Sequence, residues 1–201
     1  MAEPKPDDYH FWVAAFSGGL AGAMLTQGWQ WLVTYWNSRK LQADFGKQWE
    51  GCVVENVAFR DREGFLGQKK YLRLRVFNNG LTMAKDVQVI IVKISAAGSS
   101  NKWSSSGEVF DAFWSSADRN LRMDIPSKTP RFADLCSASD DPNRGALEIC
   151  AGGGNIGHLK DKDVRGTISL EICITAQNAK TITKGIKFTF DGTANGLLIV
   201  G

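Results

Sequence analysis

Apolar residues follow two different patterns along the chain, and the change comes near residue 50. Residues 11–36 carry no charge and are mostly apolar, which is the pattern of a helix that crosses a lipid bilayer. At about 1.5 Å per residue, such a helix measures roughly 39 Å and exceeds a hydrocarbon core of about 30 Å. Aromatic residues stand at both ends, where membrane proteins place an aromatic belt. The pattern therefore predicts an N-terminal transmembrane helix over residues 11–36.

The residues on either side of this segment indicate whether it is cleaved and which way it crosses the membrane. Residues 1–10 form a short acidic tail, whereas a cleavable signal peptide begins with a basic region. A signal peptide and a buried core helix stay open as alternatives. Basic residues are more frequent after the segment, at Arg39, Lys40 and Lys47. The positive-inside rule then predicts a single-pass membrane protein with the lipid bilayer as a partner and a cytoplasmic C-terminal domain.

Small residues within the segment predict contacts between helices. Gly18 and Gly22 are four positions apart, a spacing that lets two helix backbones approach closely in lipid. This pair makes a homo-oligomer through the helix a candidate assembly. A helix that stays alone is the open alternative.

A narrower apolar stripe follows this segment. Leu41, Phe45 and Trp49 are four positions apart in an otherwise polar stretch, so they share one face of a helix. Residues 37–50 are therefore predicted to form a juxtamembrane helix or stalk.

Beyond residue 50, apolar and polar residues alternate with a period of two, the pattern of half-buried strands. Tyr71–Phe77 alternates in this way and ends at an Asn-Asn-Gly turn signal. Thr167–Thr175 alternates too, and we expect it to form a hairpin with the segment that contains Phe188. Further strands are predicted at Asp86–Ile94, Cys52–Phe59, Phe113–Trp114, Arg131–Cys136 and Ala146–Cys150.

These short strands have no convincing helix between them, which favours antiparallel pairing. For residues 51–193 the predicted fold class is an all-β antiparallel sandwich of immunoglobulin-like type. A closed β-barrel is the alternative. Residues 194–201 are expected to be a C-terminal tail.

Several segments resemble a family of membrane-tethered bacterial immunoglobulin-like modules. The stretch YLRLRVFNNGLTMAKDVQVIIVKI is similar to the part of those modules where one strand ends in an Asn-Gly turn and a second strand follows. The stretches MDIPSKTPRFADLC and ISLEICITAQNAKTITKGIKFTFDG are similar to their Ile-Pro turn and final hairpin. The resemblance spans residues 53–192 and implies a fold and an anchor. It carries over no activity and no functional residues.

Composition narrows the classes of function. Lys and Arg number 24 against 21 Asp and Glu, and the net charge of +3 comes without a clustered basic patch. Nucleic acid is therefore not an expected partner. Four Cys are too few for a scaffold built on disulfides, and free thiols are expected.

Motifs that could carry a cofactor or a metal lack the necessary context. The glycines of residues 152–157 match GxGxxG, but no apolar helix follows to bind a pyrophosphate, so a flexible turn is expected. The candidate zinc ligands share wide spacing without a CxxC pair, and they are Cys136, Cys150, His158 and Cys173. No cofactor and no metal are predicted.

Catalytic residues are equally sparse. Histidine occurs only at His10 and His158, and there is no GxSxG elbow. Acidic residues that could attract calcium stand in turn-like segments without ligand spacing, and they are Asp140, Asp141, Asp161 and Asp163. We therefore expect no enzyme. A membrane-bound hydrolase that uses His158 is the catalytic alternative.

One loop is a candidate for partner contact. Residues 96–120 are rich in Ser and contain several aromatic residues, among them Trp103 and Trp114. Loops at the end of a sandwich often bind, and Trp is favoured at contacts. A core strand around Trp114 is the competing interpretation. The predicted function is a membrane-tethered binding or scaffolding module that recruits a protein partner, with an extracytoplasmic envelope or adhesion module as the alternative.

Overall fold

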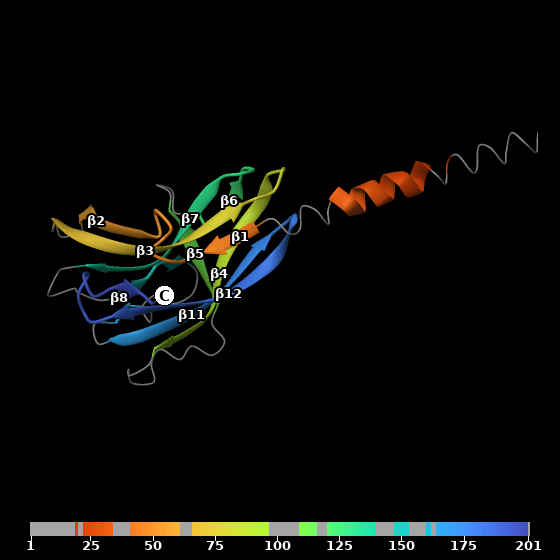
Figure 1. Cartoon of the computed structure of the whole chain (residues 1–201). Helices are drawn as coiled ribbons and strands as arrows, with labels where there is room; N and C mark the ends of the chain where they lie inside the picture. Colours follow the sequence, from red (N-terminus) through yellow and green to blue (C-terminus); the bar gives the residue numbers. More distant parts are fainter. Residues whose placement is uncertain are drawn as a thin grey trace, which may run out of the picture.

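The computed structural model describes residue 19 and residues 22–33, 41–60, 66–96, 109–115, 120–139, 147–152, 160–161 and 164–200. Within these residues the chain is all-β apart from a helix that includes residues 22–33 (Figure 1). The strands of the described part are β1 (Leu41–Asp44), β2 (Val53–Arg60), β3 (Leu66–Asn78), β4 (Ala84–Ala96), β5 (Phe110–Trp114), β6 (Arg122–Ile125), β7 (Pro130–Ser139), β8 (Leu147–Ile149), β9 (Ala151–Gly152), β10 (Lys160–Asp161), β11 (Gly166–Ala176), β12 (Ala179–Phe190) and β13 (Leu198–Ile199).

These strands form one antiparallel sheet with the main order β1-β3-β7-β5-β4-β11-β12-β13. β5 joins the two halves, because its first residues pair with β4 and its last residues pair with β7. The sheet curls until β1 lies beside β12. Figure 1 shows the two halves as layers, with β2 and β3 on one side and β11 and β12 on the other. Since no ladder between described residues joins β1 to β12, the sheet does not close into a barrel.

One hydrophobic core lies between the two halves of the sheet. On β3, Leu72, Leu74 and Val76 are fully buried, and the residues between them are partly exposed. β11 follows the same alternation, with its buried positions running from Ile168 to Ile174. Each fully buried aliphatic side chain of this kind contributes about 1.5–3 kcal/mol relative to an exposed one. The alternation in the sequence thus sets the core face of each strand.

The strand predictions are confirmed where the structure describes the chain. β3 and β4 contain the predicted Tyr71–Phe77 and Asp86–Ile94, and β11 contains Thr167–Thr175. β11 and β12 pair as the predicted hairpin, with Ile168 opposite Phe188. The weaker predictions correspond to β2, β5, β7 and β8.

Residues 37–50 differ from their predicted helix or stalk. Leu41–Asp44 form β1 and pair with β3, from Leu41 opposite Asn78 to Asp44 opposite Arg75. Leu41 joins the core at 6% exposure. The free edge of β3 offers backbone hydrogen bonds and an apolar neighbour, and these outweigh the local helical spacing. The sheet accordingly begins at Leu41 and ends at Ile199, outside the predicted limits of residues 51 and 193.

The predicted transmembrane helix is wrong. In the described part of the chain, no helix is long and apolar enough to cross a membrane. The described residues of the predicted span include the polar side chains of Thr26, Gln27 and Gln30. The single-pass membrane location and the orientation inferred from that helix are wrong with it. The other positions of the predicted span, residues 11–18, 20–21 and 34–36, lie outside the described residues.

Candidate functional site

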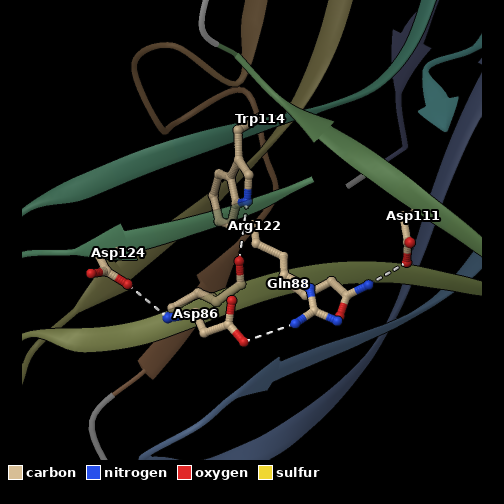
Figure 2. Close-up of polar contacts among 7 residues, drawn as sticks. Asp86, Gln88, Asp111, Trp114, Arg122 and Asp124 are labelled. Atoms are coloured by element: carbon tan, nitrogen blue, oxygen red, sulfur yellow. Dashed lines mark hydrogen bonds and ion pairs between the residues drawn. The ribbon is translucent and has the colours of Figure 1, made fainter. Parts of the chain in front are cut away.

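The two tryptophans predicted as partner contacts fall in different places. Trp114 is 1% exposed and lies in the core. Its indole Nε1–H donates a hydrogen bond to the carbonyl of Val87 at 3.2 Å, as Figure 2 shows. This side chain therefore stabilises the sheet and has no surface to offer a partner. Trp103 lies outside the described residues.

The two glycines predicted at a helix contact are also divided. Gly18 lies outside the described residues. Gly22 is an exposed position of the helix, and a Cβ placed there would meet no atom within 4 Å. Among the described residues, no second element lies against Gly22.

The cysteines are free thiols. Burial raises the pKa of Cys136 well above its usual value. Burial also raises the pKa of Cys150 to about 12, and the carboxylates of Asp134 and Glu148 add to the rise. Both thiols are therefore protonated near neutral pH, whereas nucleophiles and metal ligands need the thiolate. Cys173 lies on β11, opposite Ile90 of β4.

The remaining chemical candidates lie largely outside the described residues. This holds for His10, His158, the acidic side chains of the turn-like segments and residues 153–157 of the glycine motif. Gly152 itself ends β9. Among the described side chains, no three His, Cys, Asp or Glu residues are grouped as a metal ion requires.

Three turns meet at one end of the sheet, and we call this region the three-turn end. Its members are residues 79–83 between β3 and β4, residues 126–129 between β6 and β7, and residues 177–178 between β11 and β12. The N–H of Lys128 donates to the carbonyl of Asn78 at 2.7 Å. The N–H of Gln177 donates to the carbonyl of Lys85 at 3.0 Å. Backbone hydrogen bonds thus connect all three turns.

The buried side chain of Asn78 holds the first turn in place by hydrogen bonds. The residue is only 2% exposed. Its Nδ2 donates to the carbonyls of Thr82 at 2.8 Å and Ile125 at 2.9 Å. Its Oδ1 accepts from the N–H of Gly80 at 2.9 Å. One buried amide therefore holds both ends of the turn and joins it to β6.

Two further side chains hold the same turn from the sides. Asn178 accepts from the N–H of Lys85 and donates to the carbonyl of Met83, each at 2.9 Å. The Nζ of Lys128 donates to the side chain of Asn79 at 2.7 Å and to its carbonyl at 2.9 Å. The backbone of residues 79–83 is thus fixed by neighbours from two other turns.

A polar network extends this support along β4 (Figure 2). Asp86 has a positive φ of 54° at a bulge, and its N–H donates to the Oδ1 of Asp124 at 2.8 Å. Arg122 donates to the Oδ2 of Asp86 at 2.9 Å. Gln88 donates to the Oδ1 of Asp111 at 2.6 Å. These contacts hold β4 against β6 and β5 directly behind the three-turn end.

The tip of the first turn is apolar and exposed. Leu81 is 72% exposed and Met83 is 42% exposed. Lys85 and Lys128 are exposed at the same end and add positive charge. The space between the turns is about 10 Å³, no more than one water molecule occupies. This space is too small for a small-molecule ligand, so the exposed apolar tip is better suited to contact with a macromolecule.

The outer face of β3 carries a cluster of aromatic and basic side chains. The guanidinium of Arg75 lies 4.7 Å from the Trp49 ring and 4.8 Å from the Phe77 ring. It also pairs with Asp44 at 2.5 Å, and Arg73 pairs with Asp134 at 2.7 Å. Because rings and carboxylates within the sheet already engage these two cations, this face stabilises β1, β3 and β7 together.

A shallow hollow lies on the outer face of β4, β11 and β12. Its volume is about 580 Å³, and its lining residues are Lys93, Ser95, Ser169, Leu170, Glu171, Thr183, Gly185, Ile186, Lys187 and Val200. A Cβ at Gly185 would meet no atom within 4 Å, so a missing side chain in mid-strand creates the space. The hollow is open to solvent, so it is the weaker candidate.

Comparison with known proteins gives little more. No protein family matches the chain, and no curated protein matches it. Among solved structures, a chain described as "The archaeal flagellum of Methanospirillum hungatei strain JF1" is similar over 96% of this chain and 93% of its own length, with 14% identity and a TM-score of 0.44. A likeness this weak carries no inference about function.

Proposed function

We propose that this chain is a protein-binding module and that the three-turn end contacts its partner. The observation that carries the proposal is the exposure of Leu81 and Met83 on a turn whose backbone is already fixed. A fixed turn loses little conformational freedom on binding, so the burial of its apolar side chains contributes more fully to affinity. The sequence predicts partner recruitment, and we assign the contact to the three-turn end.

The charge of the surface indicates the chemistry of the partner. Lys85 and Lys128 flank the apolar tip and are exposed. A partner surface with an apolar centre and acidic residues at its rim complements this arrangement. The rim charges would act mainly on the rate of association, and the apolar centre would supply most of the affinity.

We also propose, from the order of the strands, that the curled sheet is an immunoglobulin-like sandwich. Seven strands of the main path, taken along the chain, are β1, β3, β4, β5, β7, β11 and β12. One half of the sheet then has the order first-second-fifth-fourth, and the other half has third-sixth-seventh. This is the order of an immunoglobulin constant-type sandwich, in which loops at the ends of the strands are the usual binding regions. The first turn and the β11–β12 turn occupy such positions.

Site-specific photocrosslinking tests the proposal. A photoreactive amino acid at position 81 of the full chain, introduced in the native cells, should capture one predominant protein. The same group at Val109, which is 58% exposed beside β5, is the matched control and should not capture it. Capture of the same protein from both positions would contradict a specific surface at the three-turn end.

Affinity measurements with the captured protein complete the test. Leu81→Ser should weaken binding by about 1–3 kcal/mol, as at an interface hot spot. Because Leu81 is exposed, unfolding by urea should change by less than about 0.5 kcal/mol. Unchanged affinity in this variant would reject the assignment of Leu81 as a contact.

A further inference from the structure

The helix of residues 22–33 presents large apolar side chains to solvent. Every residue in this range is exposed. The large apolar ones are Met24 at 71%, Leu25 at 74%, Trp29 at 69%, Trp31 at 68%, Leu32 at 44% and Val33 at 39%. In Figure 1 the helix lies apart from the sheet. Another apolar surface is needed to cover these side chains.

The apolar side chains of this helix share one broad face. At about 100° per residue, Met24, Leu25, Trp29, Trp31, Leu32 and Val33 fall within an arc of about 200°. Thr26, Gln27 and Gln30 occupy the opposite side. The helix is thus amphipathic, with an apolar arc wider than the roughly 100° stripe of an ordinary surface helix.

A glycine lies within this arc, among the larger side chains. By the same angular spacing, Gly28 falls between Met24 and Leu32. A Cβ at Gly28 would meet no atom within 4 Å. The arc therefore contains a hollow flanked by large side chains, and a leucine from a facing helix fits such a hollow as a knob fits a hole.

We propose that the same helix of a second copy of this chain packs on the middle of the apolar arc, around Leu25, Gly28 and Leu32. The described residues of the arc carry no charge, so two copies can face each other without burying a charge or opposing like charges. Each copy supplies both a hollow at Gly28 and leucines at positions 25 and 32 to fill it. A specific interface buries roughly 1,000 Å² or more in total, and the two tryptophans of each copy, at about 150–250 Å² each, can supply much of that area.

This association is independent of the proposed partner binding and places two three-turn ends in one assembly. A partner that offers two matching surfaces would then bind with avidity. The two surfaces are distinct, since Leu81 belongs to the sheet and the arc belongs to the helix. Each can be changed without touching the other.

Sedimentation velocity of the full chain over about a hundredfold range of concentration tests the proposal by mass action. The wild-type chain should shift from monomer to assembly as concentration rises. The double variant Leu25→Gln, Leu32→Gln should raise the dissociation constant at least about a hundredfold, because two buried leucines per copy are lost. Circular dichroism melting of the sheet should be the same in both chains.

Two control variants make the result specific. Leu198→Gln makes the same chemical change at a leucine of β13 that is 41% exposed and should associate like the wild type. Gln27→Ser with Gln30→Ser changes the polar side of the helix and should also associate normally. The proposal is overturned if the wild type stays monomeric, if the leucine pair on the helix has no effect, or if Leu198→Gln abolishes association.

Discussion

Gly51, in the turn before β2, and Gly185, within β12, show how glycine can be required at one position and replaceable at another. Gly51 has a φ of 86°, and a Cβ there would lie 2.7 Å from Cζ of Phe132. Gly185 lies in mid-strand with open space above it. The first position needs glycine for both its backbone and its close neighbour, and the second needs it for neither.

A matched pair of substitutions tests this difference. Gly51→Ala should destabilise the chain by about 1–3 kcal/mol, because the side chain must take a strained φ and displace the Phe132 ring. Gly185→Ala should be neutral or stabilise by up to about 1 kcal/mol, since alanine costs less entropy on folding. Urea unfolding of both variants gives the two values. Equal losses at the two positions would refute the argument.

Cys150 links burial to a pH dependence of stability. Its folded pKa is raised by burial to about 12, above the value of about 8.5 expected for an unfolded thiol. As pH rises between these values, the unfolded chain loses this proton first, so its free energy falls relative to the folded chain. The contribution is fully present below about pH 8.5 and is lost as pH rises toward about 12.

Urea unfolding across this range should show the effect. Between about pH 9 and 11, this thiol should lower the free energy of unfolding by about 1.4 kcal/mol for each pH unit. Cys150→Ala removes that contribution, so the stability difference between the wild type and the variant should shift steadily with pH. A constant difference would mean that Cys150 ionises as readily in the folded chain as in the unfolded one.

At the level of elements, β1 is set by its neighbours rather than by its own residues. Leu41, Phe45 and Trp49 have helical spacing, yet Leu41–Asp44 pair with the end of β3. The strand brings Leu41 into the core and Asp44 to Arg75 at 2.5 Å. It also covers an edge of β3 that would otherwise expose backbone groups to other chains.

Removal of β1 should therefore weaken the sheet. A chain that begins at Glu50 loses the β1 ladder, the buried Leu41 and the ion pair of Asp44, whereas a chain that begins at Leu41 keeps them. We expect the shorter chain to be less stable by about 2–5 kcal/mol, from one buried leucine and several hydrogen bonds, and to aggregate more readily. Urea unfolding and light scattering of both chains provide the test, and equal stability would show that β1 is dispensable.

At the level of the whole molecule, the sheet curls until its two ends meet without pairing. β1 lies beside β12, and the Nζ of Lys184 donates to the carbonyl of Ala43 across the gap. A lysine directed across an edge is a common protection against pairing with other chains. The curled shape also brings the three turns together, although the side chains that connect them lie far apart in the sequence, as with Asn178 and Lys85.

The sequence predicted the strands better than it predicted the site. Strict alternation around Leu72 and Ile172 reports which side of each strand is buried, because successive side chains of a strand point to opposite faces. Leu81 and Met83 gave no comparable signal, since their turn was recognised only by its Asn and Gly. Trp114 carried a strong signal for a contact, but burial in the core accounts for it equally well.

The sequence by itself determined the all-β character of the chain, the main hairpin and the core face of most strands, because these follow from local alternation and turn residues. It did not determine what surrounds the N-terminal helical segment, because an uncharged apolar run suits a bilayer or a partner helix equally. Tertiary structure alone decided the pairing of β1, the curl of the sheet and the fixed turn that displays Leu81. These depend on contacts between distant residues such as Asn78 and Ile125, and a local pattern holds no information about them.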